Sequence, residues 1–211
     1  MSEPHIPSTP SASVSEIGQM PRSRVITAIA IFAALAIALH TSPLKMPAPY
    51  APFLIYELWE IPIVAAFLLY GIRLGLSVTV INFLSLMVIF PGSLQAGPIY
   101  NLIAIMSMLL GMLAAFKLAG LSSKLRSGLR VFWLALILGI TARVAVMAVV
   151  NLVLLQMSAP LGFSIPFGAV VAMLPQIILF NATVAAYSIV IGRMVTMTVS
   201  SATRVPARYG R

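Results

Sequence analysis

Residues 131–155 read VFWLALILGITARVAVMAVVNLVLL, an apolar run with a single charged side chain, that of Arg143. A helix needs roughly 20 predominantly apolar residues to cross a hydrocarbon core about 30 Å thick, so this run predicts a membrane-spanning helix. An arginine near the centre of such a helix costs about 3 kcal/mol even on lenient insertion scales. We therefore expect Arg143 to face the interior of a helical bundle or a water-filled cavity.

The composition of the whole chain predicts a polytopic helical membrane protein. Of its 211 residues, 61% are hydrophobic and 8% are charged, whereas about 25% of the residues of a soluble domain are charged. Cysteine is absent, which excludes disulfides and cysteine-based metal sites. The formal net charge is +9, but the basic residues stand singly between apolar runs. We interpret them as signals of membrane topology and expect no nucleic-acid partner.

Six apolar segments predict an all-α membrane protein with six transmembrane helices, near residues 24–41, 58–71, 74–91, 98–118, 130–157 and 166–193. The second segment is short, and a helix that begins nearer Pro52 is the alternative. Gly71 and Gly75 predict a tight turn before the third segment, because glycine tolerates a positive φ. We expect one transmembrane domain at 22–195, a disordered tail rich in serine and proline at 1–21, and a basic cytoplasmic tail at 196–211.

The distribution of lysine and arginine predicts that both termini are cytoplasmic. If the chain crosses the bilayer six times, its loop and terminal bases fall on one side, and Lys45 alone falls on the other. Cytoplasmic segments of membrane proteins carry the excess of basic residues. The bases on the predicted cytoplasmic side are Arg22, Arg24, Arg73, Lys117, Lys124, Arg126, Arg130, Arg193, Arg204, Arg208 and Arg211.

The chain has no aspartate, and two of its four glutamates lie in YELWEIP (residues 56–62), at the predicted outer start of the second helix. In one interpretation this stretch is a helix start anchored at the membrane interface. Acidic residues suit a helix N-terminus, and Trp59 then joins an interfacial aromatic belt. In the other interpretation, Glu57 or Glu60 pairs with a buried cation or a ligand group. Arg143 is the candidate cation, but helical periodicity alone does not determine whether Glu60 touches it.

Polar residues inside the predicted helices have two explanations. Arg143, Met147 and Asn151 follow at intervals of four, which puts them on one face of the fifth helix. In the first explanation, such residues form interhelical hydrogen bonds and Arg143 forms an ion pair with Glu60. In the second, they converge in an outward-facing small-molecule pocket under the apolar, proline-rich loop TSPLKMPAPYAPFLIY (residues 41–56). The other intramembrane polar residues are Asn82, Asn101, Gln176 and Asn181.

Several classes of chemistry lack their motifs in this chain. No GxxxxGK[ST] sequence occurs, so the chain is not itself a P-loop ATPase. His5 and His40 are isolated, which predicts no metal site. Without aspartate, and with no sequence context around its glutamates, the chain is not expected to be an enzyme. Ala30, Ala34 and Ala38 form a stripe of small side chains in the first helix, along which another helix can approach closely.

Five stretches, in this order, resemble the substrate-binding S components of energy-coupling factor (ECF) vitamin transporters, and most of all the riboflavin-type branch. They are ELWEIP (57–62), LLYGIRLG (68–75), GPIYNLIA (97–104), RVAVMAVVNLVLL (143–155) and LPQIILFNATVAAYSIVIGRM (174–194). The likeness extends over roughly residues 24–195. Each stretch is a weak signal alone, and their order, spacing and membrane sidedness together carry the resemblance.

The resemblance implies a six-helix, multi-pass subunit of the cell membrane that is not an enzyme, holds no cofactor and captures a vitamin, with riboflavin expected first. A membrane partner, the T component, and two ABC-type ATPases would then drive transport. In this family an Ala-x-x-x-Ala pattern in the first helix contacts the T component, so Ala30, Ala34 and Ala38 are implied partner-binding residues. The expected substrate-binding residues are Tyr50, Tyr100, Asn101, Arg143, Met147, Asn151 and Gln176.

The chain departs from the riboflavin-type pattern at several positions. Glu57 and Glu60 stand where aspartates are usual, Asn82 stands where a lysine is common, and no lysine stands near Phe180. Another vitamin or heterocycle is therefore the alternative substrate. A structural or assembly subunit without a ligand is a second alternative, and a path for ions or protons through Glu60 and Arg143 is a third.

Overall fold

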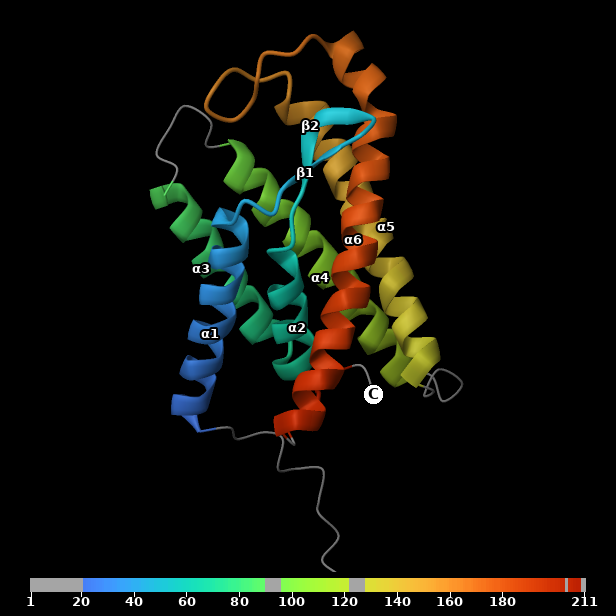
Figure 1. Ribbon diagram of the computed structural model, residues 1–211. Coiled ribbons are helices and arrows are strands. Elements are labelled where there is room, and N and C mark those ends of the chain that lie inside the picture. Colours follow the sequence, from blue (N-terminus) through green and yellow to red (C-terminus); the bar gives the residue numbers. More distant parts are fainter. Residues whose placement is uncertain (1–20, 90–95, 122–127, 204, 210–211) are drawn as a thin grey trace, which may run out of the picture.

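Six helices and one β-hairpin make up the described parts of the chain (Figure 1). The computed structural model describes residues 21–89, 96–121, 128–203 and 205–209. Within these ranges, five helices are long and apolar enough to cross a membrane. In chain order the elements are α1 (Arg22–Thr41), β1 (Met46–Ala48), β2 (Ala51–Tyr56), α2 (Glu60–Tyr70), α3 (Ile72–Ile89), α4 (Ala96–Leu121), α5 (Gly128–Leu154) and α6 (Phe167–Thr203).

Helix α2 is the short central helix of the bundle. It has 11 residues, and all of them from Glu60 to Leu69 are buried, because α1, α3 and α6 pack around it. Its length of about 16 Å is roughly half the thickness of a hydrocarbon core. Six complete crossings therefore stay a prediction. The large apolar core of the protein surrounds this helix and includes the fully buried Phe67, Met108, Leu109 and Ile189.

The two ends of the bundle differ in charge. At one end α1 begins, α2 meets α3, α4 ends, α5 begins and α6 ends (Figure 1). We call it the basic end, because the described bases of these segments are Arg22, Arg24, Arg73, Lys117, Arg130, Arg193 and Arg208. The β-hairpin and the α5–α6 loop lie at the other end, the hairpin end, together with Lys45. Lys124, Arg126, Arg204, Arg211 and residues 1–20 of the predicted tail lie outside the described residues. Which end faces the cytoplasm stays a prediction.

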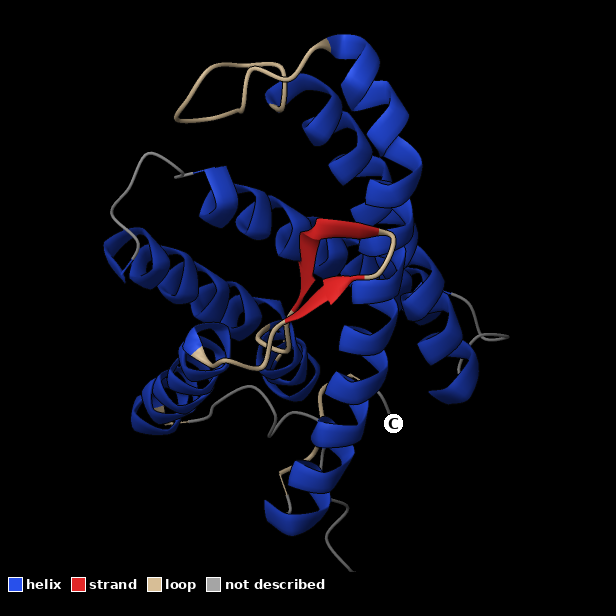
Figure 2. Ribbon diagram, turned by 45° about the horizontal axis from the view of Figure 1, so that its top comes forward, coloured by secondary structure: helices blue, strands red, loops and turns tan. Residues whose placement is uncertain are grey.

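The segment between α1 and α2 is not an irregular loop, so the all-α prediction was wrong here. Strand β1 pairs antiparallel with β2, with Met46 opposite Tyr56 and an irregularity after Pro47. The helix start near Pro52 is also wrong, since β2 occupies that position. Aromatic and β-branched residues favour strands, and the prolines of this segment disfavour a helix interior. The hairpin lies across the middle of the bundle end (Figure 2).

The connection between α2 and α3 is a single residue, Gly71, with φ at 95°. A backbone of this kind favours glycine, because a Cβ clashes there. Gly75 has a different role from the one predicted, because it lies inside α3 and not in a turn. A Cβ at Gly75 would lie 2.8 Å from the Cβ of Phe67, so this glycine lets α3 approach α2 closely.

Helix α6 continues to Thr203, past the predicted end near residue 193, and residues 205–209 then return to the bundle. The backbone N–H groups of Arg208 and Tyr209 donate hydrogen bonds to the carbonyls of Leu69 (3.1 Å) and Leu68 (2.9 Å). These carbonyls belong to the last turn of α2, which has no intrahelical donors for them. The ring of Tyr209 stacks on Phe116 with centroids 4.4 Å apart. This part of the predicted basic tail is therefore packed against the central helix.

We expect Gly71→Ala to lower the free energy of unfolding by about 1–3 kcal/mol, because the positive φ is costly for any residue with a Cβ. The added methyl group would also lie 2.8 Å from Cδ of Arg208 and disturb residues 205–209. The measurement is the unfolding midpoint of the purified protein in detergent. Gly120→Ala is the matched control, because its Cβ meets nothing within 4 Å. An equal effect of both substitutions would contradict the role assigned to Gly71.

Candidate functional site

A cavity of about 550 Å³ lies at the hairpin end, between α4, α5 and α6 and against β2. Sites for small organic molecules typically enclose about 300–1,000 Å³ with mostly apolar walls and a few polar groups. The cavity lies above the N-terminus of α2, where the short helix leaves the bundle unfilled. Its lining residues are His40, Phe53, Leu54, Ile55, Glu57, Gly97, Tyr100, Asn101, Ala104, Arg143, Met147, Asn151, Leu155, Phe163, Ile165, Met173, Ile177, Phe180 and Asn181.

Five of the seven residues expected to bind substrate line this cavity. They are Tyr100, Asn101, Arg143, Met147 and Asn151. The last three come from α5, so the spacing of four does bring them to one face, as predicted. Tyr100 also donates a long hydrogen bond of 3.4 Å to the carbonyl of Leu161 in the α5–α6 loop. Their contact with a substrate stays a prediction.

Tyr50 and Gln176 do not line the cavity. Tyr50 lies in the turn of the hairpin, and its hydroxyl is 2.6 Å from the hydroxyl of Tyr56. Burial and this hydrogen bond raise the pKa of Tyr50 to about 12, so its phenol stays protonated. Gln176 precedes Ile177, which does line the cavity, and adjacent residues on a helix point about 100° apart. The sequence did not fix the rotation of α6 closely enough to exclude Gln176.

A buried ion pair forms the floor of the cavity. Nη1 of Arg143 lies 2.5 Å from Oε2 of Glu60, and the two residues are 3% and 2% exposed. The Nε–H of Arg143 donates to Oδ1 of Asn181 at 3.0 Å, and the hydroxyl of Ser188 donates to Oε2 of Glu60 at 3.3 Å. This network joins α2, α5 and α6. Glu60 therefore does touch Arg143, which the sequence left open.

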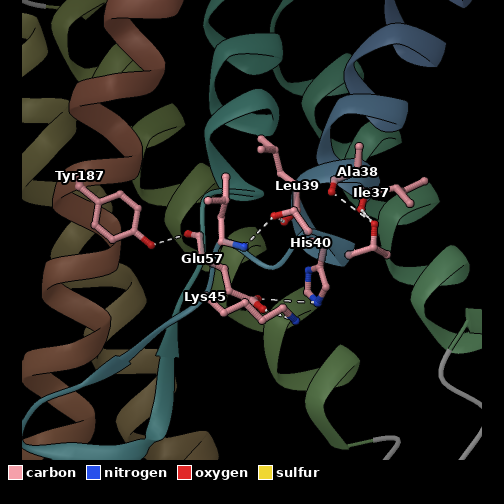
Figure 3. A network of polar contacts seen from close by, with 10 residues as sticks. Ile37, Ala38, Leu39, His40, Lys45, Glu57 and Tyr187 are labelled. Atoms are coloured by element: carbon pink, nitrogen blue, oxygen red, sulfur yellow. Dashed lines mark hydrogen bonds and ion pairs between the residues drawn. The ribbon is translucent and has the colours of Figure 1, made fainter.

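The other acid of YELWEIP, Glu57, forms a second cluster at the rim of the cavity (Figure 3). Its Oε1 lies 2.7 Å from Nζ of Lys45, and its Oε2 lies 3.7 Å from Nε2 of His40. The carbonyl of Glu57 accepts a hydrogen bond of 2.6 Å from the hydroxyl of Tyr187. The cluster ties both ends of the hairpin to α1 and α6.

Trp59 does not belong to a lipid-facing aromatic belt, so the interfacial interpretation of YELWEIP was wrong for this residue. The indole is only 4% exposed, and its ring centroid lies 5.2 Å from that of His40. The rings pack together because the chain between β2 and α2 turns into the bundle. A sequence window cannot distinguish a tryptophan at an interface from one buried under a hairpin.

The amides differ in what they can offer a ligand. Nδ2 of Asn151 donates to the carbonyl of Met147 at 2.7 Å, which leaves its Oδ1 as an acceptor. Both amide atoms of Asn181 are engaged, since Nδ2 donates to the carbonyl of Ile177 at 2.9 Å and Oδ1 accepts from Arg143. Asn101 has no side-chain hydrogen bond to any described residue. Among the amides of the cavity wall, those open to a ligand are therefore Asn101 and Asn151.

Sequence reasoning found only part of the apolar wall. Phe53 comes from β2, within the loop 41–56 that was predicted to cover the pocket, whereas Phe163 comes from the α5–α6 loop, which was not singled out. Phe180, Ile177 and Met173 share one face of α6 at helical spacing, which a periodicity argument could have grouped. Asn82 lies outside the cavity wall, in a small gap behind Asn101.

The alanine stripe of α1 points away from the rest of the bundle. Ala30, Ala34 and Ala38 are exposed, whereas Ala33 and Ala36 of the same helix face the core. An intramolecular partner for the stripe is therefore excluded among the described residues. The stripe is an exposed surface of small side chains, against which a helix from another chain can pack closely.

The fold is shared with a solved structure, described as the S component of a bacterial ECF transporter. The TM-score is 0.71 at 22% sequence identity, and the match covers 87% of this chain and 99% of that chain. No protein-family model matches the sequence, and no match is found among curated proteins. The shared fold and the five apolar helices of spanning length describe a multi-pass membrane protein.

We expect Arg143→Met to lower the free energy of unfolding by about 3–5 kcal/mol, because it leaves the Glu60 carboxylate buried without its partner. The double variant Glu60→Met with Arg143→Met removes both charges and should recover most of this loss. Unfolding by titration with SDS measures the three proteins side by side. A double variant no more stable than Arg143→Met would show that the ion pair is not the cause.

Proposed function

We propose that this protein is the substrate-binding S component of an ECF-type importer and that riboflavin is its substrate. The observation that carries the proposal is the cavity of about 550 Å³ at the hairpin end, in a fold shared with an S component. A subunit that only held other chains together would have no need for a cavity of small-molecule size.

The walls of the cavity suit a flat heterocyclic ring. Met147, Tyr100 and Phe180 supply apolar and aromatic surface, and polarisable sulfur packs favourably against aromatic rings. Asn101 and Oδ1 of Asn151 supply hydrogen bonds for the polar edge of the ring. An isoalloxazine has such an edge, and the resemblance in sequence to the riboflavin-type branch favours riboflavin over other heterocycles.

The departures from the riboflavin-type pattern suggest how this chain would bind the ring. Phe180 lines the cavity in the region where that branch has a lysine, so a stacking contact would replace a charged one. Arg143 would act by orienting Asn181 and the floor of the cavity, because its guanidinium already binds Glu60. Another neutral heterocycle is the alternative substrate that this geometry would accept.

Transport would require partner chains, because the sequence has no nucleotide-binding motif. We propose that the exposed stripe of Ala30, Ala34 and Ala38 packs against a T component, which links the protein to two ABC-type ATPases. The basic end would then face the cytoplasm and the hairpin end the outside of the cell membrane. This orientation would open the cavity to the vitamin outside the cell.

Riboflavin should copurify with the protein and bind to it after extraction. We expect Asn151→Leu and Asn101→Leu each to weaken binding about 10- to 100-fold, because a lost hydrogen bond to a buried ligand group costs about 1–3 kcal/mol. Fluorescence titration of riboflavin measures the affinity. Gln176→Leu is the matched control, since Gln176 lies near the cavity but does not line it. Unchanged binding in both asparagine variants would place the ligand elsewhere.

A bulky residue in the alanine stripe should block assembly without affecting the ligand. We expect Ala34→Phe to abolish copurification with coexpressed T component and ATPases, because close helix packing needs small side chains. The riboflavin affinity of the isolated subunit should stay within about twofold of wild type, since Ala34 faces away from the cavity. Ala114→Phe is the control, as Ala114 is exposed on α4 instead. Assembly that survives Ala34→Phe and not Ala114→Phe would move the partner surface to α4.

A further inference from the structure

The cavity wall has two ionised side chains at neutral pH among its described residues, Arg143 and Glu57. Each has a partner of opposite charge that is not part of the wall. Glu60 lies 2.5 Å from Arg143, and Lys45 lies 2.7 Å from Glu57. His40 also lines the cavity, and an ordinary imidazole, with a pKa of about 6.5, is mostly uncharged above pH 7. The formal charges around the cavity therefore cancel.

The guanidinium of Arg143 carries no uncompensated charge for an anionic ligand. It is 3% exposed and already binds Glu60 through Nη1 and Asn181 through Nε, so only Nη2 keeps donors without a side-chain acceptor among the described residues. An anion that entered the cavity would lose its hydration, which is costly without a counter-charge. Glu60 would also repel it through the floor. A cationic ligand near Glu57 would also lose its hydration without gaining a free counter-charge, because Lys45 already neutralises that carboxylate.

We infer that Glu60 determines the charge specificity of the cavity, acting through Arg143 as a positioning residue that does not itself line the site. By cancelling the charge of the guanidinium, it makes the cavity select uncharged ligands and reject those with a carboxylate, a phosphate or a fixed positive charge. This inference rests on the proposed function in one respect, namely that the cavity is the ligand site. It does not depend on riboflavin being the ligand.

Trp59 gives a direct reporter of ligand binding. It is buried beside His40, a lining residue, whereas the other tryptophan of the chain, Trp133, is 54% exposed on α5. In the Trp133→Phe background, quenching of Trp59 emission at pH 8 measures binding to the folded protein in nanodiscs. The panel is riboflavin, its 5′-phosphate, a flavin with a carboxylate on the ring, thiamine and biotin. The two flavin anions carry their charge at opposite ends of the ligand. Whichever end of the ligand points to Arg143, one of the two anions therefore places its charge at the floor of the cavity.

We expect riboflavin to bind at least about tenfold more tightly than either flavin anion, because the anions lose hydration without a counter-charge. Equal or tighter binding of either flavin anion would overturn the inference. Binding of thiamine or biotin in preference to riboflavin would overturn it as well, while leaving the S-component proposal intact. If riboflavin does not bind and another uncharged heterocycle does, the result supports the charge inference and contradicts the proposal that riboflavin is the substrate. A protein that binds no vitamin contradicts both.

Substitution of Glu60 tests its role directly. Glu60→Gln leaves the charge of Arg143 uncompensated, so the preference for riboflavin over the flavin anions should fall by about tenfold or more. Glu60→Asp keeps the charge and should keep the wild-type preference. A merely structural role predicts that Glu60→Gln weakens all ligands by the same factor, and that result would overturn the inference.

A double variant covers the case in which Glu60→Gln does not fold. Glu60→Gln combined with Arg143→Gln removes both charges and leaves amides that can still bond across the floor. It should fold and show the wild-type preference for the uncharged flavin, because the cavity is neutral again. Tighter binding of flavin anions to this double variant than to wild type would show that Glu60 does not act by cancelling the charge of Arg143, and would overturn the inference.

Discussion

The ion pair between Glu60 and Arg143 is the constraint on which the rest of this structure depends. A charge this deep among apolar helices is tolerated only with a partner and further hydrogen bonds. Asn181 and Ser188 provide these bonds from α6, so one polar network fixes how α2, α5 and α6 face each other. It also fixes the depth of α2, because Glu60 is the first residue of that helix. Below the pair the bundle is a packed apolar core, and above it lies the cavity.

The short length of α2 explains why a cavity exists at all. Helices α4, α5 and α6 continue past its N-terminus, and no helix fills the space that they enclose there. A β-hairpin lies over part of that space, and its strand β2 contributes Phe53, Leu54 and Ile55 to the wall. Glu57 then holds both ends of the hairpin to the bundle through Lys45, His40 and Tyr187 (Figure 3). The two acids of YELWEIP thus build the floor and the rim of one site.

Local sequence patterns predicted the helices and one face of the site, and non-local contacts decided the rest. Arg143, Met147 and Asn151 could be placed together, because a spacing of four is fixed by the helix itself. The pairing of Glu60 with Arg143 depends on how two helices rotate against each other, and Gln176 fell outside the cavity for the same reason. The hairpin escaped prediction because its prolines and aromatic residues also suit an irregular loop. No short stretch of the sequence indicates that residues 205–209 return to α2.

That return has a consequence for how the protein is made. Helix α2 lies at the centre of the bundle, yet the carbonyls of Leu68 and Leu69 receive their donors from Arg208 and Tyr209. These residues leave the ribosome long after α2 has entered the membrane. During synthesis the last turn of the central helix must therefore be satisfied by water or by the insertion machinery. The centre of the bundle is completed only when residues 205–209, which follow α6, come back to it.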